Sequence, residues 1–130
     1  MPKNILVFDR KTGQFTLKNI DTLKDMQNIV GGLIQPVSIK DDDKGSIDIV
    51  VNEEGLILGL PLTVMSEDKE LMLVGNFFIA RASYSTGEYI NLTKKDIDWI
   101  NKLPVKKLLF KTETKQLEEY YVLIIPNPYV

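Results

Sequence analysis

The strongest apolar pattern lies in the centre of the chain, from Ile49 to Ile79. Three apolar runs, at residues 49–51, 56–60 and 73–79, are broken or followed by glycine, and Asn or Glu stands beside two of the breaks. Apolar runs of this length bounded by turn residues are typical of buried strands. We therefore expect buried strands here, with the polar residues at the breaks placed around a shaped and partly dry site.

The residues before this centre predict a hairpin and an edge strand. Residues 5–8 are apolar, residues 14–20 alternate, and Gly13 ends the turn between them, which indicates a β-hairpin. Residues 33–39 are the next strand, and Pro36 within it cannot donate a ladder hydrogen bond. We therefore expect this strand to lie at a sheet edge or to contain a bulge.

Two short helices are predicted from their capping residues. Thr22 with Asp25, and Thr93 with Asp96, have the spacing of a capping box, in which each residue satisfies a free backbone N–H group of the other. Glycine follows the first helix at residues 31–32, where it adopts the left-handed C-cap conformation without steric cost. Helices this short depend on packing for their stability.

The remaining segments complete the expected secondary structure. Pro61 is expected to begin a helical turn that runs through Met65, because proline suits the first helical position. Residues 71–82 are the longest strand candidate, and Gly75 within them indicates a bulge or a close backbone approach. Residues 107–125 favour a final hairpin with a long loop, or else a strand, a helical turn and a strand.

These elements predict an α+β fold: a single domain over residues 1–130 with a mostly antiparallel sheet, two short helices and a C-terminal β-hairpin extension over residues 107–130. A chain of 130 residues with 44% apolar and 26% charged residues is typical of one globular domain. No apolar run approaches the roughly 20 residues that span a bilayer, and the N-terminus lacks the pattern of a signal peptide. We therefore expect a cytoplasmic protein without a membrane partner.

The absence of two residue types excludes several kinds of catalytic and metal site. The chain has no cysteine and no histidine. Nucleophile–histidine catalysis and metal sites made of His or Cys are therefore excluded within one chain. The net charge of −2 and the pI of about 5.2 argue against binding of bulk nucleic acid, which needs a basic face. We expect no metal and no cofactor, although one or two cations suffice to hold a small phosphate.

Asparagine and glycine in the centre of the chain are the candidate ligand-binding residues. Asn52 and Asn76 are expected to end neighbouring strands and to face one pocket, where the backbone of Gly59 and Gly75 lets a ligand approach closely. Arg81 adds one charge nearby. The alternative is structural, since asparagine in a turn often satisfies local backbone groups and a lone arginine is commonly a surface residue.

Tyrosines near the end of the chain are the candidate partner-binding residues. Tyr120, Tyr121 and Tyr129 have an apolar ring with a polar tip, and tyrosine is enriched at protein interfaces. Packing on the sheet is the alternative role. Homo-oligomerisation is a further expectation, because an edge strand offers unpaired N–H and C=O groups.

Four short motifs occur in one order at close spacing: Val-Gly-Gly-Leu-Ile at 30–34, Asn-Glu-Glu-Gly at 52–55, Gly-Leu-Pro at 59–61 and Val-Gly-Asn at 74–76. With residues 87–96, this order resembles a family catalogued only as a domain of unknown function (number 3846), made of small proteins of bacterial phages, plasmids and related mobile elements. The resemblance covers about residues 4–100. Thr63 stands where members tend to have Asn, and the tail from Lys107 has no counterpart in the family.

Together these features predict a non-enzymatic accessory protein of a phage or mobile element that counters a host defence function by binding. The resemblance implies the context and supplies no activity. The protein either sequesters a small nucleotide-like signal or inhibits a host protein through an acidic, Tyr-bearing surface. The alternatives are an enzyme that uses Asp48, Glu53, Glu54 and a divalent metal, and a structural or regulatory subunit that docks through its C-terminal hairpin.

Overall fold

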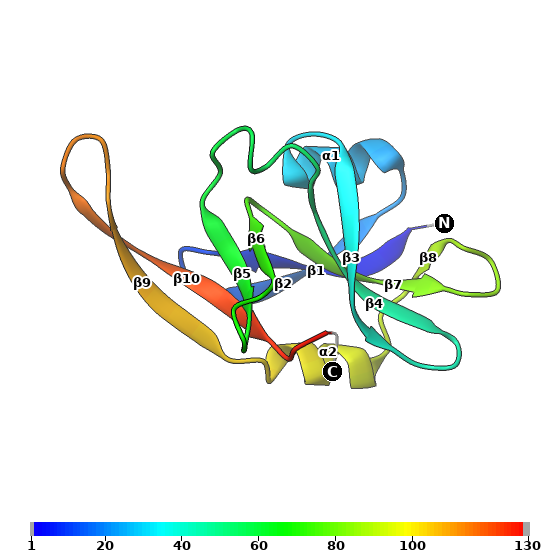
Figure 1. The fold of residues 1–130 in the computed structure, drawn as a ribbon. Helices are drawn as coiled ribbons and strands as arrows, with labels where there is room; N and C mark the ends of the chain where they lie inside the picture. The colour runs from blue at the N-terminus through cyan, green and yellow to red at the C-terminus, as the bar shows by residue number, and fades with distance from the viewer. Residues whose placement is uncertain (1, 129–130) are drawn as a thin grey trace.

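Ten strands and two helices make up the computed structural model, which describes residues 2–128 (Figure 1). The strands are β1 (Lys3–Asp9), β2 (Gln14–Ile20), β3 (Ile34–Asp41), β4 (Gly45–Asn52), β5 (Leu62–Ser66), β6 (Met72–Val74), β7 (Phe78–Ser83), β8 (Tyr89–Ile90), β9 (Val105–Lys111) and β10 (Leu117–Ile125). The helices are α1 (Leu23–Val30) and α2 (Lys94–Asn101). The predicted α+β fold class is confirmed.

The strands form two sheets. The larger has six strands in the order β2-β1-β7-β4-β3, with β8 beside β7, and the smaller has four in the order β6-β5-β10-β9. Neighbouring strands are antiparallel except for β5 and β10, which are parallel. Strand β3 lies at an edge of the larger sheet and has an irregularity between Ser38 and Lys40. The expectation of an edge strand or bulge around Pro36 is thus confirmed on both counts.

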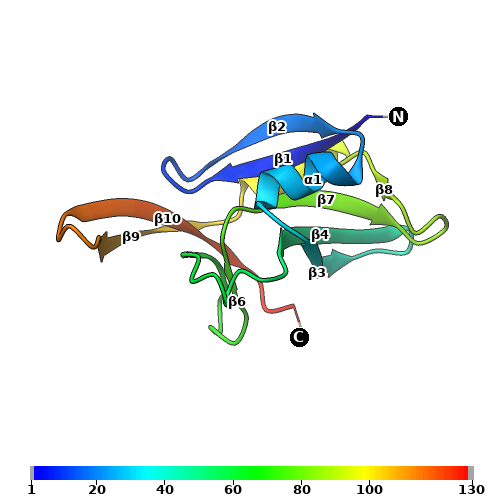
Figure 2. The same ribbon diagram turned by 90° about the horizontal axis from the view of Figure 1, so that it is seen from above.

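The larger sheet is covered on both faces. Helix α1 packs on one face, where Val30 meets Val50 and Phe78 in one apolar cluster (Figure 2). Helix α2 and the smaller sheet pack on the other face, where Ile100 and Leu123 belong to a second cluster. Strand β4 is therefore buried along its whole length. Among residues 2–128, no helix has the length and apolar character needed to cross a bilayer.

Both helices begin as the capping boxes predict. Thr22 Oγ1 accepts from the Asp25 backbone N–H at 3.1 Å, and Asp25 Oδ2 accepts from the Thr22 N–H at 3.1 Å. Thr93 and Asp96 make the same pair of bonds at the start of α2. Gly31 ends α1 with a φ of +82°, as expected of a glycine C-cap.

The prediction of a buried strand at residues 56–60 is wrong. These residues lie in the loop between β4 and β5, where Leu56 is 81% and Ile57 is 87% exposed. The loop is held by its own backbone, because the N–H of Leu58 bonds to the Glu54 carbonyl and the N–H of Leu60 bonds to the Gly55 carbonyl. These bonds within the loop take the place of pairing with a strand, and Leu56, Ile57 and Leu58 face solvent.

Two further predictions in this region are wrong. The segment after Pro61 is not a helical turn, because Leu62 and Val64 pair with β6 and Val64 also pairs with β10. Residues 71–82 are not one strand. Gly75 has a φ of +84° and redirects the chain, so that β6 belongs to the smaller sheet and β7 to the larger.

The C-terminal residues form a hairpin, as one of the two expectations had it, but its loop is short: residues 112–116 join the strands, and Glu118 and Glu119 belong to β10. Strands β9 and β10 pair along their length from Val105 with Leu123 to Lys111 with Leu117. The outer part of this hairpin extends away from the two sheets (Figures 1 and 2). We call this outer part, residues 108–120, the arm; the next residue, Tyr121, already packs on the β1–β2 turn.

Candidate functional site

Asn52, Gly75 and Asn76 lie around one hollow of about 270 Å³. The other lining residues come from the ends of β1 and α1 and from the loop before β5: Arg10, Val30, Gly31, Leu58, Leu60 and Pro61. Gly59 stands between two of these loop residues with a φ of +68°, which shapes the turn. The structure thus brings together the central asparagines and the Gly-Leu-Pro segment.

Asn52 is held in place by hydrogen bonds to the protein. Its Nδ2 donates to the Val30 carbonyl at 3.3 Å, and its Oδ1 accepts from the Glu54 backbone N–H at 2.8 Å. The side chain is buried and joins the end of α1 to the end of β4. A Cβ on Gly32 would lie 2.9 Å from Asn52 Nδ2, so glycine is required for this approach. Asn52 therefore forms a fixed part of the wall of the hollow, with its amide bonded to the protein.

Gly75 places Asn76 at the mouth of the hollow. A Cβ at Gly75 would lie 2.7 Å from Leu60 Cδ1, so the loop before β5 packs directly on this glycine. The Gly75 N–H donates to the Pro61 carbonyl at 2.7 Å, and Thr63 Oγ1 donates to the Gly75 carbonyl at 2.7 Å. With its backbone fixed in this way, Asn76 presents an exposed amide.

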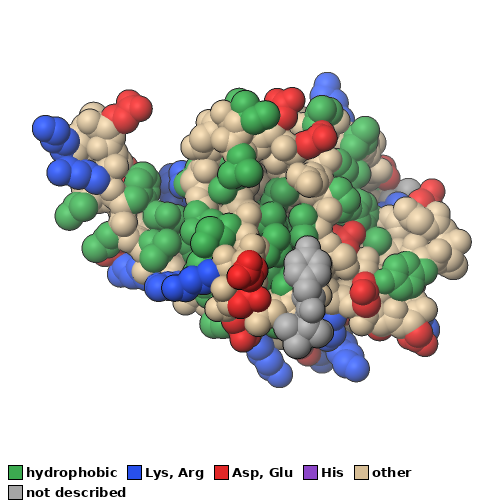
Figure 3. Space-filling model, viewed as in Figure 1, with side chains coloured by type: hydrophobic (Ala, Val, Ile, Leu, Met, Phe, Trp, Pro, Cys, Tyr) green, Lys and Arg blue, Asp and Glu red, His purple; other side chains and the backbone are tan. Residues whose placement is uncertain are grey.

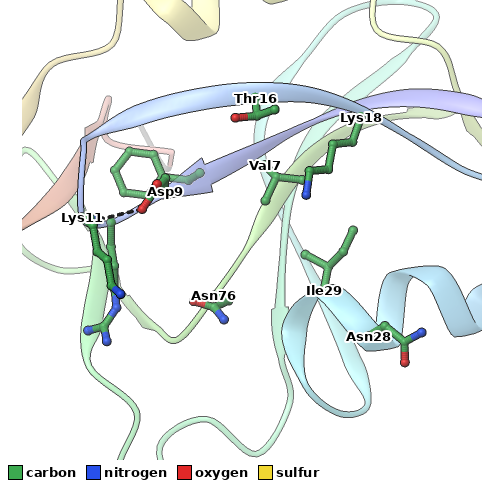
Figure 4. A pocket seen from close by; sticks show the side chains of 10 residues that line it. Val7, Asp9, Lys11, Thr16, Lys18, Asn28, Ile29 and Asn76 are labelled. Carbon is green, nitrogen blue, oxygen red and sulfur yellow. Dashed lines mark hydrogen bonds between the residues drawn. The ribbon is translucent and has the colours of Figure 1, made fainter.

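A second hollow of about 500 Å³ adjoins the first and shares Arg10 and Asn76 with it. Figure 4 shows Thr16 and Lys18 from β2, Ile29 from α1, and Asn76 around this space. The remaining lining residues are Val7, Phe8, Asp9, Lys11 and Asn28. We call the two hollows together the groove.

Positive charge is concentrated in the groove. Arg10, Lys11 and Lys18 all line it. Asp9, which is the one acidic residue among the described residues that line it, uses Oδ1 to accept from the Lys11 backbone N–H at 2.8 Å. The amide of Asn76 adds donors and an acceptor, and Val7 and Ile29 add apolar contact. The groove therefore offers cations, amides and apolar surface to one small ligand.

Arg81 lies outside the groove. Its guanidinium binds Asp96 through two hydrogen bonds of 2.7 Å and also bonds to Asp42 at 2.8 Å. Arg81 joins β7, the start of α2 and the β3–β4 turn. Its hydrogen bond lowers the pKa of Asp42 to about 2. Burial opposes ionisation of Asp96, but the hydrogen bonds from Arg81 and Thr93 outweigh it and lower the pKa of Asp96.

The candidate partner-binding tyrosines have separate placements. Tyr120 lies on the arm with its ring 5.0 Å from that of Phe110, edge to face. Tyr121 packs on the β1–β2 turn, where a Cβ on Gly13 would lie 2.9 Å from its ring, and its backbone N–H donates to the Arg10 carbonyl. Tyr129 lies outside the described residues.

The carboxylates of the enzyme alternative do not gather. Asp48 faces away from its neighbours Ile47 and Ile49, as the alternation predicts, yet it is buried and accepts from Ser46 Oγ at 2.8 Å. Burial raises the pKa of Asp48. Glu53 and Glu54 are exposed on the turn after β4. Within residues 2–128, no three acidic side chains approach closely enough to hold a metal ion.

Sequence reasoning missed the cations of the groove. Arg10 and Lys11 belong to a hairpin turn, where charged residues are ordinarily solvated. Lys18 comes two residues after Thr16 in β2, so both side chains lie on one face of the hairpin. This spacing was the signal in the sequence that could have placed Lys18 beside Thr16. The missing information was that the end of α1 and Asn76 lie against that same face.

Residues 2–104 match the family described as Domain of unknown function (DUF3846). The match includes every residue that lines the groove and ends just before β9. No curated protein and no solved structure shows significant similarity to the chain. Because the match spans most of its length, the chain belongs to the DUF3846 family.

Proposed function

We propose that the protein is a non-enzymatic binding protein that holds a small nucleotide-like anion in the groove. The observation that carries the proposal is the convergence of Arg10, Lys11 and Lys18 with the amides of Asn28 and Asn76 on one hollow. The chain as a whole has a net charge of −2, so this positive charge is a local feature of the groove.

The chemistry of the groove suits each part of such a ligand. Arginine and lysine bind phosphate oxygens through charge-assisted hydrogen bonds. An asparagine amide both donates and accepts, as the edge of a nucleobase does, and Val7 and Ile29 offer apolar contact to a planar ring. The hollow of about 500 Å³ falls within the range of small-molecule sites, roughly 300–1,000 Å³.

The context we propose is an accessory protein of a phage or mobile element that sequesters a host signal and so counters a defence function in the host cytoplasm. The resemblance of the sequence motifs to proteins of such elements supports this context. Sequestration requires affinity and no reacting group, which suits a groove of cations, amides and aliphatic side chains.

Native mass spectrometry of the full chain, purified from a bacterial lysate, tests the proposal. We expect one bound small molecule that leaves on denaturation and has the ultraviolet spectrum of a nucleobase. Lys18→Met and Asn76→Ala should lose it, whereas Lys95→Met, which changes an exposed lysine on α2, should keep it. The proposal fails if the wild-type chain carries no such molecule and adenosine or guanosine monophosphate produces no heat on titration, or if all variants bind equally.

A second candidate function, inhibition of a host protein, is favoured by the exposed loop after β4. Leu56, Ile57 and Leu58 project from a loop with its own hydrogen bonds, and Figure 3 shows hydrophobic side chains over it. Ordered, exposed apolar side chains are typical of protein interfaces. Ile57→Asp should then abolish co-purification of a host polypeptide, and Leu17→Asp, at an exposed leucine on β2, should not. Equal co-purification with both variants would exclude the loop.

A further inference from the structure

Among residues 2–128, no strand pairs with the outer backbone edge of β9. It is the last strand of the smaller sheet. Tyr121, the residue opposite Lys107, directs its N–H to the Arg10 carbonyl rather than to β9. Because hydrogen-bonded and non-bonded pairs alternate in antiparallel strands, the N–H and C=O groups of Lys107 and Leu109 point away from β10. This edge is free to pair with another strand.

The arm also carries apolar side chains without a core beneath them. Leu108, Phe110 and Tyr120 lie half-buried on one face, where Phe110 and Tyr120 contact edge to face. Leu109 and Leu117 are exposed on the other face. Figure 3 shows hydrophobic side chains along the arm, which stands apart from the body of the molecule. An open strand edge flanked by apolar groups is a site for strand pairing.

We propose that β9 pairs antiparallel with β9 of a second copy of this chain, with Leu108 on the two-fold axis. Leu108 is the midpoint of the seven residues of β9, so this register pairs the strand along its whole length. It places Leu108 opposite Leu108, Lys107 opposite Leu109, Lys106 opposite Phe110 and Val105 opposite Lys111. No lysine then faces another lysine.

Neighbouring registers are less favourable because they oppose like charges. An axis at Lys107 places that lysine opposite its own copy, and an axis at Leu109 places Lys107 opposite Lys111. Like charges directly opposite each other destabilise a strand pair. The charge pattern of β9 therefore selects the register centred on Leu108.

The dimer completes the apolar face of the arm. The central row across the joined sheet reads Tyr120, Leu108, Leu108 and Tyr120, with Phe110 of each copy beside it. This gives Tyr120 the interface role that its residue type indicates. The arm lies beyond the part of the chain that matches the DUF3846 family, so dimerisation is an addition to the function proposed for the groove.

Proline on the open edge tests the interface. Sedimentation equilibrium of the full chain is expected to give about twice 14.8 kDa, and Leu109→Pro is expected to give 14.8 kDa. Because the Leu109 N–H points outward, proline removes no hydrogen bond within the hairpin. Leu17→Pro on β2 is the matched control, with 55% exposure against 63% for Leu109. The Leu17 N–H also points outward. Phe8 donates its N–H to the Phe77 carbonyl and so away from β2, which makes Phe8 and Phe15 a non-bonded pair, and Leu17 lies two residues after Phe15.

A single introduced cysteine tests the register of the pairing. It also tests whether the dimer forms if Leu109→Pro does not fold. In the proposed pairing the two copies of residue 108 form a non-bonded pair with Cα atoms about 4.5 Å apart, within disulfide reach. The chain has no other cysteine, so Leu108→Cys should cross-link fully on oxidation. Lys106→Cys should not, because its two copies lie about 13 Å apart along the strands.

Each opposite result overturns the proposal. A wild-type mass of 14.8 kDa at every concentration would exclude the dimer. A Leu109→Pro dimer, or a Leu17→Pro monomer, would place the interface elsewhere. Cross-linking of Lys106→Cys as complete as that of Leu108→Cys, or no cross-linking of either, would exclude the register.

Discussion

Replacing Arg81 by methionine tests whether this residue supports the fold or binds a ligand. Arg81 is 8% and Asp96 is 5% exposed, and two hydrogen bonds of 2.7 Å join them. Methionine keeps much of the side-chain volume but removes the charge and every donor. Asp96 then retains the bond from the Thr93 backbone N–H to Oδ2 at 2.8 Å, while Oδ1 loses its partner.

The free energy of unfolding should fall by about 3 kcal/mol. Removing one partner of a buried ion pair leaves the other charge uncompensated, which costs about 3–5 kcal/mol. The remaining capping bond places Asp96 at the lower end of this range. Since a domain has a total stability of about 5–15 kcal/mol, the variant loses a substantial fraction of it but retains a folded population.

The pH dependence provides a second measure of the same pair. The folded pKa of Asp96 lies below its ordinary value of 3.8, so the stability it contributes is present above pH 3.8 and is lost as the pH falls through the folded pKa. In Arg81→Met, burial of Asp96 is no longer opposed by the guanidinium. The part of the acid destabilisation that comes from Asp96 should therefore become smaller.

Urea unfolding followed by the fluorescence of Trp99, at neutral and acid pH, measures both effects. Lys24→Met is the control, because Lys24 is an exposed residue of α1 and its replacement should leave the unfolding midpoint almost unchanged. A loss of less than about 1 kcal/mol in Arg81→Met would refute the reasoning. So would a stable, folded variant that has lost the ligand of the groove, since Arg81 would then act in binding.

Two further predictions concern Gly75 and Asp48. Gly75→Ala should lower the free energy of unfolding, measured with urea, by about 1–3 kcal/mol, because an alanine is strained at a φ of +84° and its Cβ would lie 2.7 Å from Leu60. Gly59→Ala is the control, because Gly59 has a similar φ of +68° but open space around it, so the loss should be smaller. An equal loss in the two variants would contradict the packing argument. Asp48→Asn should raise the Tm at pH 7. Burial raises the folded pKa of Asp48 above 3.8, so its contribution is present below pH 3.8 and is lost as the pH rises through the folded pKa. Calorimetry that shows no gain at pH 7 would contradict this sign.

Features that depend on a few neighbouring residues could be read from the sequence. The capping boxes of Thr22 and Thr93, the C-cap at Gly31, the first hairpin and the position of Pro36 in an edge strand were all predicted and are all confirmed. In each case the stabilising contact joins residues close in the chain, or the residue type restricts its own backbone. The α+β class follows from the sum of these elements.

Contacts between distant segments decided the rest. Residues 56–58 have the composition of a buried strand, but within the part of the chain that the structure describes no strand pairs with them, and they are exposed. Arg81 is drawn to Asp96 and Asp42 because β7, α2 and the β3–β4 turn converge there.

The groove shows the same division between local and distant contacts. Its asparagines and glycines were visible in the sequence, and their grouping with the Gly-Leu-Pro segment was predicted. The cations of the β1–β2 hairpin joined them only because the crossing of the chain at Gly75 sets Asn76 against that hairpin and the end of α1. Local propensities determine the elements, whereas a binding site depends on which distant side chains the packing of those elements brings together.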